Sequence, residues 1–345
     1  MKSRWFILLA VAALSTACST NIDIFADYKQ VPIVYSLLDA RADTNYVKIT
    51  RAFYAPDDTY LVAANPDSSN YPGRLDVRLV EYCNGDSIRE IILDTITVHN
   101  KNEGIFYAPS QKLYYTAEPL NQNNGTKYRY HYKLKAVLPS RVLTSETDIV
   151  GNGRFGVQSL AVNFSKEYFG TNRPFLFHPA TNAYIYQVTM SFTFNEQRTP
   201  DGDTIPRTFT WDIGTYSDEY LASHMDNDCY VFTYRPESFH AKLKEFVGND
   251  STIEGVRRYL TDYPVEVTIT AGGEKLRQYI YNNDASNGFS PGDPEFSLVD
   301  GGYGVFSSRM TAKGKVRLAG ETVPELLAMP HWGFVFIGGR ENDGE

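Results

Sequence analysis

The sequence has 345 residues, 42% of them hydrophobic, and a formal net charge of −8. Removal of the N-terminal signal described below takes away two basic residues and no acid, which leaves 31 basic against 41 acidic residues and a net charge of −10. Such an acidic surface argues against nucleic acid as a partner. The remaining length is long for one domain, so two domains are expected.

The chain begins with an export signal. Two cationic residues precede the apolar run 5–14, and small residues stand directly before Cys18. The run is too short for a transmembrane helix, which needs about 20 residues. The pattern predicts a signal peptide over residues 1–17 and lipidation of Cys18, although Ser15 stands where a bacterial lipobox usually has Leu. The alternative is an ordinary secretory signal cut at Ala17.

Membrane attachment is expected to rest on this lipid alone. After Cys18 the sequence contains no second apolar run that could span a bilayer. Residues 18–29 are short and polar, which is typical of a tether between the lipid and the first folded element.

Strand signals follow the tether. Residues 32–38 are mostly apolar, and residues 46–54 alternate in polarity with the period of two of a half-buried strand. Residues 55–73 contain three prolines and many Asp, Asn and Ser residues, which predicts a long loop. Farther on, residues 75–82 and 88–98 flank an Asn-Gly pair, which predicts a β-hairpin because both residues tolerate positive φ.

The strand expected over residues 127–136 has one tyrosine-rich face and one cationic face. The cationic residues are Lys127, Arg129, His131, Lys133 and Lys135. This strip could dock an acidic partner, but we favour the solvated face of a strand near a sheet edge. About seven strands in this part of the chain predict an immunoglobulin-like β-sandwich over residues 30–145.

A second β-rich domain is expected over residues 155–340, after a glycine-rich joint at residues 151–153. Its predicted strands cover residues 159–164, 183–194, 207–213, 265–270 and 304–308. Helical insertions are expected near residues 216–260, where apolar residues recur at helical spacing after Pro236, and at residues 274–281. The fold class predicted for the whole chain is therefore mainly β.

Two cysteines remain once Cys18 is lipidated. Cys83 precedes the Asn-Gly turn, and Cys229 lies far along the chain in the other expected domain. A disulfide requires Cα atoms within about 7 Å, so we favour two separate thiols over a bridge.

Three stretches together resemble a family of lipoproteins from Bacteroidota whose function is unknown. They are PIVYSLLD at residues 32–39, NYVKITRAF at residues 45–53 and GGYGVFSSR at residues 301–309. Since they lie at both ends of the mature chain, the resemblance covers the whole architecture. It implies a β-rich protein of the cell envelope and outer membrane with an immunoglobulin-like first domain. Members are often encoded near TonB-dependent transporters, which implies an accessory role, and no catalytic residue carries over.

The same phylum implies two further properties. An acidic stretch after the lipidated cysteine serves there as a surface-export tag, but residues 19–23 carry one acid, so both faces of the outer membrane stay open. Four Asp-Ser/Thr triplets match its O-glycosylation pattern, with acceptors at Ser87, Thr95, Thr204 and Ser251.

Catalytic motifs are not found in the sequence. The six histidines are all more than ten residues apart, which excludes a contiguous metal motif, and neither a Gly-x-Ser-x-Gly elbow nor a phosphate-binding loop occurs. We therefore expect no catalytic, cofactor or metal site. Acid pairs at Asp57-Asp58, Asp226/Asp228 and Asp201/Asp203 could serve a glycosidase or calcium, but acids in such turn-rich sequence are more often turn formers.

Glycan binding is the remaining chemistry that the sequence offers. Trp211, Trp332 and Tyr303 could stack on sugars, although burial in a sheet explains them equally well. The leading hypothesis is a non-enzymatic, lipid-anchored envelope protein that binds another protein, such as an outer-membrane β-barrel transport or assembly complex. The alternatives are a glycan-binding lipoprotein and, less favoured, a hydrolase.

Overall fold

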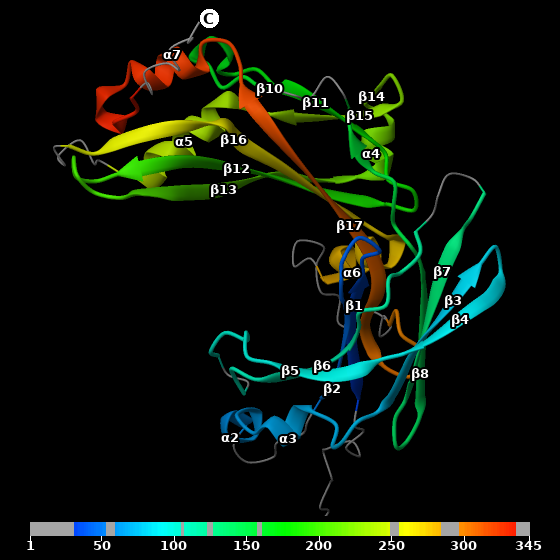
Figure 1. Ribbon diagram of the computed structural model, residues 1–345. Coiled ribbons are helices and arrows are strands. Elements are labelled where there is room, and N and C mark those ends of the chain that lie inside the picture. The colour runs from blue at the N-terminus through cyan, green and yellow to red at the C-terminus, as the bar shows by residue number, and fades with distance from the viewer. Residues whose placement is uncertain are drawn as a thin grey trace, which may run out of the picture.

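The computed structural model describes residues 31–52, 59–104, 107–122, 127–156, 161–248, 255–283 and 297–335. In this part of the chain the structure is mainly β, with several sheets and a few short helices, as the sequence predicts. The predicted signal peptide, Cys18 and the tether lie outside these residues. The strands build two lobes, and Figure 1 shows one below the other with a single strand running through both.

The first lobe consists of two sheets packed face to face. One has the strand order β4-β3-β7-β8, and the other continues as β1-β2-β6-β5 from the strand that enters from the second lobe. The strands are β1 Pro32–Leu38, β2 Asn45–Arg51, β3 Asp76–Cys83, β4 Asp86–Ile92, β5 Asp94–Val98, β6 Gln111–Thr116, β7 Tyr130–Val137 and β8 Val142–Asp148. Alternating residues of both sheets meet in one hydrophobic core, which includes Val34, Leu79 and Leu134.

The hairpin predicted at the Asn-Gly pair is confirmed. Asn84 and Gly85 have φ values of 53° and 97° and join β3 to β4. The prediction of one strand over residues 88–98 is wrong. The chain forms two strands there, because it leaves one sheet after β4 and enters the other as β5. Leu93, which is fully buried between them, lies in the core where the chain crosses from sheet to sheet.

The long loop expected over residues 55–73 is also corrected in part. Its described residues contain two short helices, α2 Thr59–Ala63 and α3 Pro66–Ser69, while residues 53–58 lie outside the described chain. The Asn65 side chain accepts a hydrogen bond from the Asp67 amide at 2.9 Å and caps α3. Asn and Pro begin helices as readily as turns, so composition alone could not separate the two.

In the second lobe, long strands form one sheet, and a smaller sheet and a helix lie against its apolar face. The long strands are β12 Ile185–Gln197, β13 Thr204–Ser217, β16 Arg257–Gly272 and β17 Tyr303–Leu318. The small sheet contains β9 Arg154–Phe155, β11 Arg173–His178, β14 Met225–Asp226 and β15 Cys229–Tyr234. The helices are η1 Lys166–Tyr168, α4 Asp218–Ala222, α5 Pro236–Val247, α6 Glu274–Asn283, α7 Thr322–Leu327 and η4 Pro330–Trp332, and β10 Ala161–Val162 pairs with β17.

Helix α5 covers the core of this lobe. Phe239, Leu243 and Val247 recur on one face and are buried among the aromatic residues of the sheet. Phe239 stacks on Phe164 with ring centroids 4.3 Å apart. The helical insertion expected near residues 216–260 is therefore found, but strands β14 and β15 interrupt it and β16 begins before its end.

Strand β17 connects the lobes. Residues 303–308 pair in parallel with β1, and residues 309–316 pair antiparallel with β16. Phe306 accordingly lies in the core of the first lobe and Met310 in that of the second. The sequence predicts only a short strand at residues 304–308 and assigns it to the second domain, whereas the structure packs this part of β17 against the first lobe (Figure 1).

Gly304 allows β17 to join β1. Its φ is 101°, and a Cβ there would stand 2.0 Å from the carbonyl oxygen of Val34. No other residue type fits this close backbone approach.

The substitution Gly304→Ala is expected to lower the free energy of unfolding by about 3 kcal/mol, because it adds both left-handed strain and a backbone clash. Chemical denaturation measures this loss. Gly104→Ala is the control, since a Cβ at Gly104 meets nothing within 4 Å, and its change should stay within about 0.5 kcal/mol. Equal losses for the two variants would contradict the role assigned to Gly304.

Candidate binding groove

The acid pairs considered from the sequence lie in turns. Asp201 and Asp203 are in the hairpin between β12 and β13, and Asp226 and Asp228 belong to the hairpin between β14 and β15. The second turn needs positive φ at Asn227 and Asp228, which explains these residue types. Asp57 and Asp58 lie outside the described residues. Within the described ranges, no group of three His, Cys, Asp or Glu residues could hold a metal ion.

The predicted modification sites fall on strands where the structure describes them. Ser87 is exposed on β4, Thr95 is half-buried on β5, and Thr204 is exposed at the start of β13. Ser251 and the lipidation site Cys18 lie outside the described residues.

Both described cysteines are free thiols, as predicted, and lie in different lobes. Cys229 Sγ is 3.5 Å from Nδ1 of His178, a pairing that resembles a nucleophile and its base. Burial, however, raises the pKa of the Cys229 thiol, and the charges of Asp226 and Asp228 raise it further. A neutral, buried thiol is a poor nucleophile, so this pair fits packing better than catalysis.

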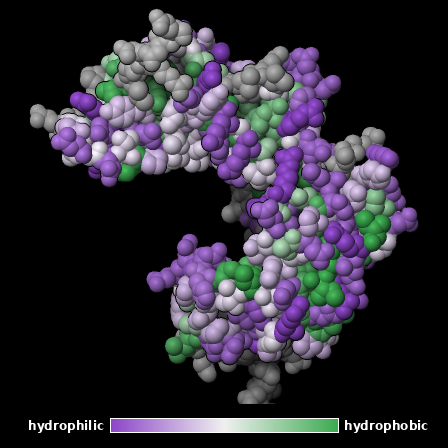
Figure 2. All heavy atoms as spheres, in the orientation of Figure 1, coloured by the Kyte–Doolittle hydropathy of each residue, from purple (hydrophilic) through white to green (hydrophobic). Residues whose placement is uncertain are grey.

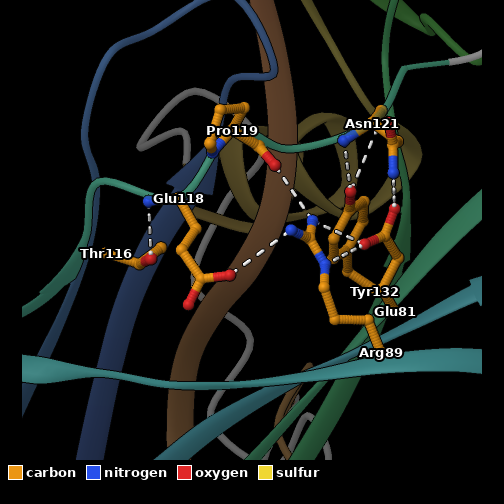
Figure 3. A network of polar contacts seen from close by, with 7 residues as sticks. All are labelled: Glu81, Arg89, Thr116, Glu118, Pro119, Asn121 and Tyr132. Carbon is orange, nitrogen blue, oxygen red and sulfur yellow. Dashed lines mark hydrogen bonds and ion pairs between the residues drawn. The ribbon is translucent and has the colours of Figure 1, made fainter.

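A buried carboxylate network in the first lobe also has a structural role (Figure 3). Arg89 of β4 binds Glu81 of β3 at 2.6 Å and Glu118 at 3.4 Å. Glu81 is fully buried and also accepts a hydrogen bond from the Asn121 side chain at 2.6 Å. The backbone amide of Asn121 donates to the Tyr132 hydroxyl at 2.7 Å. These contacts fix the segment before β7 onto the sheet, and each Glu81 oxygen has a partner within the network.

The tryptophans are not available for sugars. Trp211 and Trp332 are 4% and 5% exposed and belong to the core of the second lobe. Tyr303 is half-buried at the start of β17. Burial in the fold therefore accounts for these three residues.

A groove at the junction of the lobes is the strongest candidate site. It has a volume of about 730 Å³ and lies between α6 and the corner where β13 turns into α4. Its lining residues are Ile185, Thr215, Tyr216, Ser217, Glu219, Arg277, Gln278, Ile280, Tyr281 and Asn282. The volume is in the range of small-molecule and peptide side-chain pockets. Figure 1 places α6 beside β17 where the two lobes meet. Figure 2 shows in addition a wider hollow between the two lobes on one side of the molecule.

Exposed aromatic and aliphatic side chains gather around this groove. Tyr281 is 65% exposed and Ile280 43%, both at the end of α6. Tyr220 of α4 is half exposed and stacks on Tyr216 with centroids 6.0 Å apart. Tyr279, also on α6, meets Tyr35 of β1 edge to face at 6.1 Å, so the aromatic surface continues onto the first lobe.

The groove also presents polar groups. Arg277 donates from Nη1 to Glu219 at 2.8 Å, and its guanidinium lies 5.8 Å from the centre of the Tyr184 ring. Its Nε is buried without a hydrogen-bond partner in the described part of the chain, as is Oδ1 of Asp218. Burial raises the pKa of Asp218. Asp218 lies outside the lining, so the charged groups that the groove offers beside its apolar surface are Glu219 and the guanidinium of Arg277.

Strand β13 leads into the groove along an unpaired edge. It is 14 residues long and pairs with β12 on one side. No described residue pairs with its other edge, and its last residues, Thr215 to Ser217, line the groove. A long unpaired edge is a template for an added strand.

The cationic strip is partly neutralised. Strand β7 lies between β3 and β8, one position in from the sheet edge. On the face predicted to be tyrosine-rich, Tyr132, Leu134 and Ala136 are buried and Tyr130 is half-buried, but Tyr128 lies before the strand and is 38% exposed. His131 Nδ1 is 2.9 Å from Asp148 and Nε2 is 3.5 Å from Glu146, both on β8. The hydrogen bond with Asp148 raises the pKa of His131.

Helix α6 follows from the sequence, but its contribution to a groove does not. The feature that could have indicated a binding role is the pair of large apolar residues Ile280 and Tyr281 at the end of a helix that buries none of its residues.

Within the described ranges no helix is long and apolar enough to cross a membrane. Comparison with models of known protein families finds no match, and comparison with curated proteins finds none either.

The His131 contacts predict a pH-dependent contribution to stability. Because the pKa is raised above its ordinary 6.5 in the folded chain, the contribution is complete below about pH 6.5 and is lost as the pH rises through the raised pKa. The difference in unfolding free energy between the native chain and His131→Gln should therefore shrink with rising pH.

Denaturant titrations from about pH 5 to about pH 8 measure this difference. His99→Gln serves as the control, because the described contact of His99 is with the Ser110 hydroxyl, which carries no charge. A His131→Gln difference that grows with pH would contradict the assignment.

Proposed function

We propose that this protein is a non-enzymatic, lipid-anchored envelope protein that binds an extended segment of another envelope protein. The observation that supports this most is the aromatic groove at the end of the unpaired edge of β13. An extended segment that pairs with β13 would gain backbone hydrogen bonds, and its end would enter the groove. Ile280 and Tyr281 would contact an apolar side chain there.

We also infer that the first lobe is an immunoglobulin-like sandwich. Its strands, taken in chain order as A, B, C, C′, D, E, F and G, group as A-B-E-D and C′-C-F-G. Tyr132 on the seventh strand shares hydrogen bonds with the backbone of Asn121, at 2.7 Å and 3.2 Å. This contact is similar to the tyrosine corner of such sandwiches and supports the assignment.

The cellular location in this proposal comes from the sequence. The signal peptide and Cys18 support lipid anchoring at the outer membrane, and the resemblance to transporter-associated lipoproteins supports a β-barrel transport or assembly complex as the partner. Such an anchor allows the lobes to face either the periplasm or the cell exterior.

Glycan binding is the second candidate. The exposed ring of Tyr281 offers a stacking surface, and Arg277, Glu219 and Asn282 beside it offer hydrogen bonds. A sugar ligand would occupy the groove but would not pair with the edge of β13. The two candidates therefore assign the same groove residues to different ligands, a sugar or an extended protein segment.

Lipidation is tested with Cys18→Ser. The native chain should fractionate with membranes, and its mature N-terminal peptide should carry diacylglycerol by mass spectrometry. Cys18→Ser should be recovered in the soluble fraction, because the lipid is the expected attachment. An unmodified N-terminus on the native chain would refute the anchor.

Partner binding is tested by affinity purification of the native chain from solubilised membranes, followed by measurement of binding to the purified partner. Ile280→Ser with Tyr281→Ser should weaken binding at least about tenfold, because both side chains contact the partner. Ile92→Ser is the control, since Ile92 is a comparably exposed isoleucine on β4 and lies outside the groove.

Two outcomes would count against protein binding. One is a chain that elutes alone while it retains polysaccharide, which favours the glycan candidate. The other is an equal loss of affinity in Ile92→Ser and in the groove variant.

A further inference from the structure

The two most exposed large apolar side chains of the described residues are neighbours on α2. Tyr60 is 69% exposed and Leu61 72%. Most exposed hydrophobic residues of the first lobe stand singly on strands, which is ordinary for a soluble surface. Two consecutive ones on a helical turn form a small apolar projection.

This projection is firmly attached to the first lobe. Arg51 of β2 donates to the carbonyl oxygens of Asp67 at 2.8 Å and Ser68 at 3.3 Å in α3. Lys112 of β6 donates to the carbonyl oxygen of Tyr71 at 2.6 Å. The Tyr107 amide donates to the carbonyl oxygen at the end of α2 at 3.0 Å. The apolar residues are therefore held outward by a fixed segment.

The projection lies where the lipid tether enters the fold. Pro32, the first residue of β1, pairs with Arg51, and the Ala52 amide donates to Val31 at 2.8 Å. Arg51 in turn binds α3, so the residue that pairs with the start of β1 also holds the α2–α3 segment. Figure 1 shows α2 and α3 at the end of the first lobe that is farthest from the second lobe.

Chain length limits how far this end can be from the bilayer. Twelve residues, 19–30, separate Cys18 from the described chain, and fully extended they span at most about 40 Å. Tyrosine and leucine are favourable at the membrane interface, where an aromatic ring and an aliphatic chain enter the headgroup region. The nearby cations Arg51 and Lys112 donate to carbonyl groups of the chain, so their donors are engaged within the protein, and the two side chains that project from α2 are apolar.

We propose that Tyr60 and Leu61 insert into the lipid surface to which Cys18 is anchored. The contact orients the protein, with the first lobe on the membrane and the second lobe, with β13, directed away from it. This orientation rests on the lipid anchor of the proposed function, but the contact itself depends on the α2 residues alone.

The test replaces biological lipidation with a chemical anchor. The mature chain with Cys83→Ser and Cys229→Ser is coupled through Cys18 to phosphatidylcholine vesicles that carry a small fraction of maleimide lipid. A tryptophan is introduced as Tyr60→Trp in one variant and as Ile92→Trp in the matched control, an exposed position on β4 of the same lobe. The chain without either substitution supplies the background of buried Trp211 and Trp332.

Tyr60→Trp should emit at shorter wavelength on vesicles than in detergent-free solution, and brominated phosphatidylcholine should quench it strongly. Ile92→Trp should show neither change. Adding Leu61→Ser to Tyr60→Trp should reduce the quenching, and replacing a fifth of the lipid with phosphatidylglycerol should leave it unchanged.

Equal quenching at positions 60 and 92, or none at either, would overturn the proposal. A wavelength shift of Tyr60→Trp that depends on protein density and persists without vesicles would assign the projection to a second copy of the chain instead, which also overturns it. Failure of native lipidation would leave these results unchanged, so the two failures are distinguishable.

Discussion

The structure depends on one strand that belongs to both lobes. β17 pairs with β1 over six residues and with β16 over eight. A strand can serve two sheets only if its backbone groups are bonded along its whole length, and only if it can approach both partners closely. Gly304 allows this approach at the point where a side chain would meet the Val34 carbonyl. One ladder ends at Ser308, whose hydroxyl donates to the Asp148 carbonyl oxygen and accepts from the Val150 amide, so the strand is held at the point where it would have to bend.

This constraint explains why a binding site can form at the junction. Helix α6 contacts β17 and leaves Ile280 and Tyr281 exposed, and Tyr279 contacts Tyr35 on the neighbouring lobe. The groove residues therefore come from elements that are held in fixed relation. A preformed groove binds with less loss of conformational entropy than one that must assemble. The same geometry fixes the distance between the apolar projection on α2 and the edge of β13.

Local sequence patterns predicted the local structure well. The Asn84-Gly85 turn and helix α6 follow from turn chemistry and helical spacing, and the two faces of β7 follow from the period of two. The patterns failed where tertiary structure decides. Nothing in the run from residue 88 to residue 98 marks Leu93 as the place where the chain changes sheets. The full length of β17 was missed because glycine and polar residues interrupt its apolar pattern, and pairing with β1 and then with β16 keeps the strand continuous across them.

The site was less predictable than the fold. Ile280 and Tyr281 look like core residues of a short helix, and only the packed structure leaves them exposed. Tyr60 and Leu61 lie in a segment whose composition predicts a polar loop. The tryptophans show the reverse, because residues that could have stacked on sugars are buried instead. Whether a side chain is exposed depends on the whole fold, so local sequence patterns do not predict it.

A distance measurement across the hollow tests the central claim most directly. Spin labels at Thr97 of β5 and Thr210 of β13, both exposed, are introduced as cysteines in a mature chain in which Cys18, Cys83 and Cys229 are replaced by Ser. If β17 holds the two lobes as one unit, pulsed electron–electron double resonance will give a single narrow distance distribution. A broad distribution, or two separate distances, would contradict the account.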